Sequence, residues 1–590
     1  MKRKLLSVLL TLCLAFSLLP TAALADGETA VAKVGDVEYP TLAGAVAAVA
    51  DGGTVTLLGN VTELETISIT GGKKVDLNLN EKNITFKADN YFLVDNGALN
   101  VTGKGNITSS HGNDNNTWLP TIYAYGTDAD TANYSVVTIG KDVVIDNQGS
   151  YGLAIGHKNY KAYGAKVIVE GTVTSTYGFT VTGNAKATEG NIPEITVTES
   201  GKIVSTDGSA IYAAGYGIYN IAGTLSGINF GIEIRAGKLN VEDTAKISAT
   251  GNFSDPVPNG NGSTVTGAAI AVSQHTTNLP IDVNIKGGEI SETGTNGHAL
   301  YEIDTVENEA AENVAKDVSI TVSGGSFNGN VYSTNNKLSI TGGTFSSDVS
   351  AYVADGYILN NGTVEKLGET NAVAKIGGTY YKTLADAYAA ASEDGNAEIT
   401  LLKSTTISSG MEIRKPVTLN LGGNVLTSED YGFDVYKNFT LKNGTLNTAT
   451  WGVWVQNSGV KFTLEAETVI NADCNTDRTN AAGVIVVQQA SADIKGKVTA
   501  QHNFAVSGNG SAGWGGVTIN VMPGAEISTT EDAPALYFPN STYLTITGGS
   551  ITGGTGAYVK SGSVTISGGT IIGTGAKAEY KYNGNGANST

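Results

Sequence analysis

Two short segments of this sequence place polar and aromatic side chains at the same spacing. Asp434 and Tyr436 are followed 20 residues later by Trp454 and Gln456. An indole face offers apolar surface on which a sugar ring stacks, while carboxylate and amide groups bond to sugar hydroxyls. If a repeating fold brings the two segments side by side, the four residues form a candidate glycan-binding site. The alternative is that Trp454 lies under a loop of a neighbouring repeat and covers apolar surface.

Other residues that carry chemistry are scattered. Asp128 and Asp130 offer two oxygens to calcium, but the remaining ligands of a known calcium loop are missing, so Asx turns are the preferred interpretation. No histidine has metal-ligand spacing or groups with Ser and Asp as a nucleophilic triad would require. We therefore expect no cofactor, since no motif supports calcium, and we expect loop or strand-surface positions for the histidines. These are His111, His157, His275, His298 and His502.

The N-terminus indicates export. Lys2, Arg3 and Lys4 precede an apolar run from Leu5 to Leu19 and a small-residue cleavage site before Asp26, so residues 1–25 are predicted to be a signal peptide. A membrane-spanning anchor is the less favoured alternative, because it needs about 20 apolar residues. After cleavage we expect no membrane insertion and a secreted or cell-surface location.

Charge and cysteine content narrow the class of protein further. The formal net charge of −19 becomes −22 when the three basic residues of the signal peptide are removed, which disfavours nucleic acid and anionic membranes as partners. Cys474 is then the single cysteine, so no internal disulfide stabilises the fold. Stability must come from the core and from backbone pairing.

A five-residue phrase recurs along the chain. Its second position falls at 152, 178, 208, 231, 267 and 297, then at 432, 452, 483, 503, 533 and 556, and Gly is abundant, with 76 of 590 residues. Each interval of 20 to 36 residues has room for about three short strands, so stacked coils with like positions about 4.8 Å apart are predicted. An array of immunoglobulin-type sandwiches is the alternative. The fifth position is always apolar: Ile155, Val181, Ile211, Ile234, Ile270, Leu300, Val435, Val455, Val486, Val506, Leu536 and Val559.

The repeat also predicts which side chains face outward. If the fifth position points into the bore, which is the apolar interior that the stacked coils enclose, the fourth and sixth positions point to solvent. Glu233 and Arg235 then form a surface ion pair, and the outward rows contain no two carboxylates within two rungs. The remaining outward pairs are Ala154/Gly156, Thr180/Thr182, Ala210/Tyr212, Ala269/Ala271, Ala299/Tyr301, Asp434/Tyr436, Trp454/Gln456, Ile485/Val487, Ala505/Ser507, Ala535/Tyr537 and Tyr558/Lys560. A second phrase, I-x-G-G-x-[FI], begins at Ile285, Ile340, Ile546 and Ile566.

Two helical segments divide the chain into two solenoids. Thr41 and Thr383 are each followed by apolar residues at helical spacing, as expected for a capped amphipathic helix. A solenoid needs a terminal cap over its apolar bore, so two caps predict two solenoids. We expect a first domain over residues 27–365, a linker over 366–371 and a second domain over 372–590.

The cap phrase YPTLAGAVAAVADGGTVTLL resembles the start of pectate-lyase-like right-handed β-helices. Together with GGTFSSDVSAYVADGY, it is similar to tandem β-helix surface proteins exported by Gram-positive bacteria. The resemblance implies an all-β protein of two tandem right-handed parallel β-helices with three-strand coils, each with a short N-terminal capping α-helix. It implies little about activity, because this fold hosts lyases, hydrolases and adhesins.

The catalytic residues of those enzymes are poorly matched. The lyases hold calcium on acidic residues and use Arg or Lys as base, whereas only Arg235, Arg414 and Arg478 follow the signal peptide. The triplet Asn475, Thr476, Asp477 resembles one hydrolase motif, but the Asp-Asp, Gly-His-Gly and Arg-x-Lys elements are missing, so it is interpreted as a turn.

The sequence therefore favours an exported, non-catalytic β-helix protein that acts as an adhesin or glycan-binding scaffold. Its expected partner is an extracellular polysaccharide or a glycan on a host or neighbouring cell. The alternative is a polysaccharide lyase or glycoside hydrolase of the same fold. The two hypotheses differ in whether acidic residues meet on adjacent coils.

Overall fold

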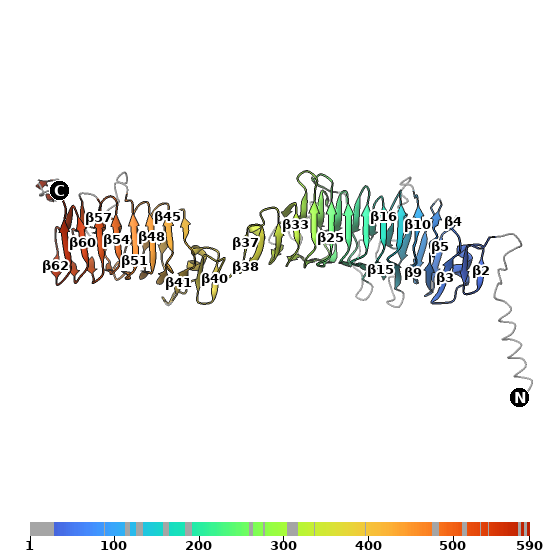
Figure 1. Ribbon diagram of the computed structural model, residues 1–590, viewed down its shortest axis with the longest axis horizontal. Coiled ribbons are helices and arrows are strands. Elements are labelled where there is room, and N and C mark those ends of the chain that lie inside the picture. The colour runs from blue at the N-terminus through green and yellow to red at the C-terminus, as the bar shows by residue number, and fades with distance from the viewer. Residues whose placement is uncertain are drawn as a thin grey trace, which may run out of the picture. The chain divides into compact units, whose positions relative to one another are not determined.

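The computed structural model describes most of the chain in two compact units, Met1–Lys366 (unit one) and Leu367–Thr590 (unit two) (Figure 1). The described residues are 29–87, 89–111, 119–125, 134–156, 164–182, 192–258, 263–274, 278–303, 317–334, 337–395, 397–474, 483–509, 516–530, 533–540 and 542–575, with the backbone alone for 256–258, 263–265, 580–582 and 587–589. The predicted signal peptide, Asp128, Asp130, His157, His275, Arg478 and the triplet 475–477 lie outside them and stay predictions. Among the described residues, no helix is both long and apolar enough to cross a membrane.

Unit one is a parallel β-helix in which each coil gives one strand to each of three sheets. Apart from its terminal hairpins, sheet A1 runs from β3 (Gly53–Leu57) to β35 (Leu338–Ile340), and sheet B1 from β4 (Val61–Glu63) to β36 (Gly343–Phe345). Alternating buried side chains fill one continuous core. Sheet C1 contains β5 (Ile67–Thr70), β8 (Phe92–Asp95), β11 (Ile122–Tyr125), β14 (Leu153–Gly156), β17 (Phe179–Val181), β20 (Ser209–Ala213), β23 (Phe230–Ile234), β28 (Ala268–Ser273), β31 (His298–Ile303) and β34 (Asn330–Tyr332).

Unit two repeats this architecture around a core of its own. Sheet A2 runs from β41 (Glu398–Leu401) to β62 (Ser563–Ile566), and sheet B2 from β42 (Thr405–Ile407) to β63 (Thr570–Gly573). The predicted fold class is therefore confirmed, and the sandwich alternative is wrong because the coils pair in parallel. Sheet C2 contains β43 (Met411–Ile413), β46 (Phe433–Val435), β49 (Val453–Val455), β52 (Ile485–Val487), β55 (Val506–Gly508), β58 (Pro534–Phe538) and β61 (Thr555–Val559).

Each unit begins with the predicted helix, α2 (Leu42–Ala48) or α3 (Leu384–Ala390). Thr41 and Thr383 accept a backbone N–H bond at 3.0 Å on their side-chain oxygens, which satisfies one free donor of each helix. Lysines of the following coil satisfy carbonyls at the other end. Lys73 Nζ donates to Val46 O and Ala47 O at 2.5 and 3.0 Å, and Lys415 Nζ donates to Ala389 O and Ala391 O at 2.9 and 3.2 Å.

Antiparallel hairpins complete the caps. In unit one, β1 (Ala32–Val34) pairs with β2 (Val37–Tyr39) and with β3, and in unit two β39 (Ala374–Ile376) pairs with β40 (Thr379–Tyr381) and with β41. These strands cover the backbone edge that the first coil would otherwise expose.

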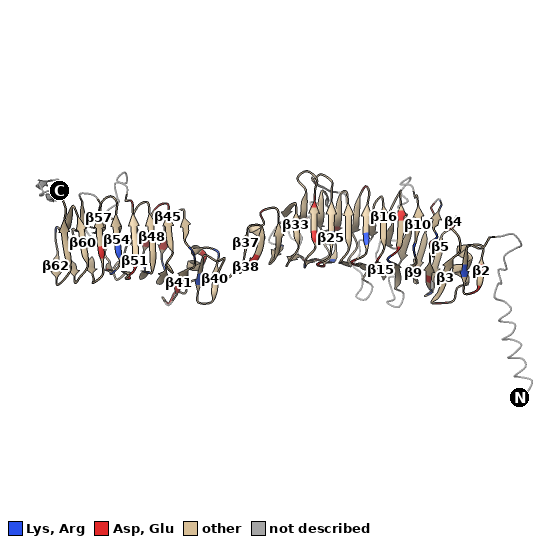
Figure 2. Ribbon diagram, viewed as in Figure 1, with Lys and Arg blue, Asp and Glu red and all other residues tan. Residues whose placement is uncertain are grey.

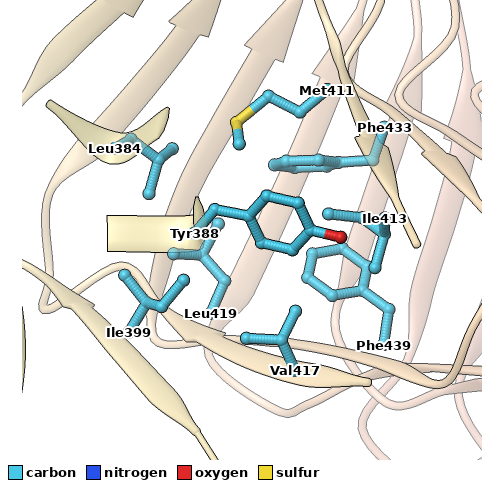
Figure 3. A pocket seen from close by; sticks show the side chains of 9 residues that line it. All are labelled: Leu384, Tyr388, Ile399, Met411, Ile413, Val417, Leu419, Phe433 and Phe439. Atoms are coloured by element: carbon cyan, nitrogen blue, oxygen red, sulfur yellow. The ribbon is translucent and has the colours of Figure 1, made fainter. Parts of the chain in front are cut away.

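A small apolar cavity beneath α3 shows how a cap meets the bore (Figure 3). Tyr388 projects from the helix among core side chains, and its hydroxyl accepts the backbone N–H groups of Arg414 and Lys415 at 2.6 and 2.9 Å. Because the lining is hydrophobic and shared with the core, this cavity belongs to the packing of the cap. The residues that line it are Leu384, Tyr388, Ile399, Met411, Ile413, Val417, Leu419, Phe433 and Phe439.

The strand register corrects parts of the predicted alignment. Ile211 pairs with Phe179, which pairs with Leu153, so it is two residues away from the row of Ile155 in which it was predicted. A shift of two keeps a side chain on the same face, and Ile211 is still in the bore. The prediction is wrong for Val486, which pairs with the outward Trp454, while its neighbours Ile485 and Val487 fill the bore.

Changing Leu42 to Asp should unfold the start of unit one alone. The side chain is fully buried, so a carboxylate there lowers the free energy of unfolding of unit one by about 3 to 5 kcal/mol. Leu384→Asp is the matched change in unit two. In calorimetry, each variant should lower one of two melting transitions, because a solenoid couples mainly to its nearest neighbours. Equal shifts of both transitions in either variant would contradict this independence.

Candidate functional site

The outer face of sheet C2 brings the four predicted site residues together. Asp434 on β46 is the direct parallel partner of Trp454 on β49. Tyr436 and Gln456 follow these strands, and their backbone N–H groups continue the coil-to-coil ladder to Ile413 O and Val435 O. The structure thus places the four residues on consecutive coils, as the 20-residue spacing predicts.

Two further aromatic rings join this surface. Tyr431 stacks on Trp451 with ring centroids 5.1 Å apart and an interplanar angle of 20°. Trp451 meets Trp454 at 5.5 Å and 83°, an edge-to-face contact. All three rings are partly exposed. Sequence reasoning missed Tyr431 and Trp451, although both occupy the first position of consecutive copies of the repeated phrase.

Side-chain hydrogen bonds fix the orientation of the indoles. Trp451 Nε1 donates to Asp434 Oδ1 at 3.2 Å, and Trp454 Nε1 donates to Gln488 Oε1 at 3.2 Å. Gln488 lies in the same row as Gln456, one coil further on, and was not predicted. Because each indole N–H has a partner in the protein, the rings are held in place before any ligand arrives.

Charged groups border the aromatic rings on one side. Glu412 on β43 is the parallel partner of Asp434, so two carboxylates do lie on adjacent coils and the prediction of none within two rungs is wrong. Arg414 Nε lies 2.7 Å from Glu412 Oε2, and its guanidinium lies 4.6 Å from the ring centroid of Tyr436. Burial raises the pKa of Asp434, the Glu412 charge raises it further, and the Trp451 hydrogen bond opposes the shift.

Glu233 and Arg235 in unit one do not form the predicted surface ion pair. Both side chains are fully buried, with Arg235 Nε 3.5 Å from Glu233 Oε1 and Arg235 Nη1 donating to Tyr212 OH at 2.9 Å. Burial raises the pKa of Glu233 to about 7, and the Arg235 charge opposes this. The outer face of sheet C1 is covered here, as shown by the buried cluster of Phe230, Ala268, Ala271 and Tyr301.

The described histidines have structural contacts. His111 occupies a loop position, as predicted, but its side chain is buried, with its ring nitrogens 2.9 and 2.8 Å from Leu119 O and Asn90 O. His298 packs against Phe253 and Tyr301, and His502 Nε2 lies 3.4 Å from Asp473 Oδ1. In the part of the chain that the structure describes, no three His, Cys, Asp or Glu side chains meet as metal ligands would.

Figure 2 shows how sparse charged residues are along the strands.

Comparisons with known proteins add little. No protein-family model and no curated protein matches the chain. Among solved structures, the PL6 family alginate lyase AlyGC is similar over 87% of this chain and 95% of its own, with 10% sequence identity and a TM-score of 0.24. At that TM-score, the assignment of the chain as a tandem parallel β-helix protein rests on its own strand register.

Replacing Glu233 by Gln should remove a pH dependence from unit one. A carboxyl group whose pKa rises from 4.5 to about 7 on folding stabilises the fold below pH 4.5 and loses that contribution as the pH rises through 7. The loss amounts to about 3 kcal/mol at 1.36 kcal/mol per pKa unit. Melting curves between pH 4 and 8 should show it in the wild type and in an exposed-site control, Glu412→Gln. A Glu233→Gln variant that loses stability over this range as the wild type does would refute the assignment.

Proposed function

We propose that this protein is an exported, non-catalytic glycan-binding scaffold, secreted or displayed on the surface of a Gram-positive-type cell. Three partly exposed rings carry the proposal: Trp454 on sheet C2, and Tyr431 and Trp451 in the turns before two of its strands. They lie beside the side chains of Asp434 and Gln488. Apolar faces flanked by carboxylate and amide groups suit a sugar, which has apolar ring faces and hydroxyl edges.

The rigidity of this surface supports binding. Each ring stacks on another ring or is hydrogen-bonded through its indole nitrogen, and the strands beneath are paired on both sides. A ligand therefore meets side chains that are already ordered, so less conformational entropy is lost when it binds. A stiff stack of coils is also a suitable support for contacts with a polymer or a cell surface.

The charges near the rings favour a neutral polysaccharide over a polyuronate. Glu412 and Asp434 both border the rings, whereas Arg414, whose guanidinium contacts Tyr436, is already paired with Glu412. The whole chain is also acidic, with a formal net charge of −19. A uronate carboxylate would therefore approach against like charge, and it would gain little from the engaged guanidinium.

The same two carboxylates support a second candidate function, glycoside hydrolysis. Hydrolases use one carboxylic acid and one carboxylate, about 5 to 10 Å apart. Glu412 and Asp434 are direct partners on adjacent rungs, whose spacing of about 4.8 Å is close to the lower end of that range. The raised pKa of Asp434 is the direction that a general acid requires. Binding remains the preferred function, because Asp434 already accepts the Trp451 indole bond and Glu412 is paired with Arg414.

Trp454→Ala should weaken the binding of a neutral oligosaccharide by about 1 to 3 kcal/mol, or roughly 5- to 150-fold in Kd, without unfolding unit two. The loss follows from removal of a stacking face, so Trp454→Phe should restore part of the affinity. Tyr543→Ala, which removes an exposed ring from another face, is the matched control. A glycan array followed by calorimetry makes the measurement. Unchanged affinity in the Trp454→Ala variant would remove the site.

Glu412→Gln and Asp434→Asn distinguish binding from hydrolysis. The wild type should release no new reducing ends from a polysaccharide that it binds, and it should bind neutral oligomers more tightly than oligouronates. The double variant should narrow that preference, because it removes the carboxylates that repel uronates. Turnover by the wild type that either single variant abolishes would establish the hydrolase instead.

A further inference from the structure

The last coil of unit two leaves part of its bore uncovered. Ile566 pairs with Ile546 and Ile571 pairs with Ile551, and both partners are buried in the core. Ile566 and Ile571 therefore continue the bore, yet they are 58% and 39% exposed. Apolar side chains this open at the end of a solenoid are a site for another element to pack.

The equivalent coil of unit one has the same sequence phrase and is covered. The phrase I-x-G-G-x-[FI] spans residues 340–345 there and residues 566–571 in unit two. Thr344 and Thr570 donate their backbone N–H groups to the preceding coil in the same way, at 2.8 and 2.9 Å. In unit one, however, Ile340 is 0% exposed and Phe345 is 7% exposed.

An antiparallel hairpin covers that coil of unit one. Strand β37 (Tyr357–Asn360) pairs with β38 (Thr363–Lys366), and β38 pairs antiparallel with β36, the last parallel strand of sheet B1. The Phe345 N–H donates to Gly362 O at 2.7 Å, and Tyr357 and Leu359 pack on the core. The hairpin thus pairs with the open backbone edge of β36 and covers the apolar side chains at the end of the bore.

We propose that the hairpin of β64 (Tyr580–Tyr582) and β65 (Ala587–Ser589) closes unit two in the same way, by packing over Ile566 and Ile571 with β65 along β63. These two strands pair with each other antiparallel, as β37 and β38 do. They follow the last strand of sheet B2, which is the point of the coil at which β37 and β38 follow β36.

Chain length and sequence pattern fit this placement. Six residues, 574–579, separate β63 from β64, and an extended chain of that length spans about 20 Å, several times the distance between neighbouring coils. In sequence, β64 alternates Tyr, Lys, Tyr, which is the pattern of a strand with one apolar face. The segment therefore has the reach and the composition to cover the bore.

Hydrogen exchange of the full chain tests the proposal. The backbone N–H of Ile571, which corresponds to that of Phe345, should exchange at least about tenfold more slowly in the wild type than in Lys581→Pro, which removes a strand donor from the hairpin. A variant lacking residues 576–590 should lose the same protection while residues 544–551 stay protected. Residues 338–345 of unit one should exchange alike in all three proteins and serve as the control.

Two outcomes would overturn the proposal. Equally fast exchange at residues 564–573 in the wild type and both variants would show that the hairpin does not cover the bore. Protection of these residues that rises with protein concentration, together with a dimer in solution, would show that a second copy covers it instead.

Discussion

Each coil of a parallel β-helix has, on its open side, a row of unpaired backbone groups and a strip of exposed apolar side chains from the bore. Both must be covered. The next coil covers both, so pairing from coil to coil determines the rest of the structure. The ends require other solutions. In this protein they are a capping helix with a hairpin at the start of each unit and a hairpin after the last coil of unit one. Lysines of the following coil also bond to carbonyls at the end of each capping helix, so the coils hold the caps in place.

The same pairing creates the candidate site. Residues 20 apart in sequence become direct neighbours, which is why Asp434 lies beside Trp454 and Glu412 beside Asp434. The strands of sheet C2 carry these three side chains. Tyr431 and Trp451, in the turns before two of those strands, add their rings in the same register.

The repeated phrase predicts the fold and, at most positions, which side chains point into the bore, because every coil places apolar residues there. The caps are predicted by the two helical segments. The wrong predictions have physical causes. At Ile211 the predicted alignment is wrong by two residues, which leaves the side chain on the correct face of the strand. Around Val486 several consecutive residues are apolar, so the sequence does not indicate which of them point into the bore. The burial of Glu233 was not predictable, since it depends on what covers the outer face of sheet C1, and that cover has no period. The burial of His111 depends on its loop contacts with Leu119 and Asn90, which have no period either. The Glu412 and Asp434 pair was missed because the predicted alignment began one copy too late: residues 409–413, Ser-Gly-Met-Glu-Ile, carry the same phrase and pair in register with residues 431–435.

We propose that the aromatic, acidic surface that coil-to-coil register forms on sheet C2 binds a neutral sugar. A crystal structure of the protein with a bound neutral oligosaccharide tests it most directly. In that structure we expect a sugar ring stacked on Trp454 or Trp451, with a hydroxyl bonded to Asp434 or Gln488. An oligosaccharide bound on another face, with the rings of sheet C2 left uncovered, would contradict it.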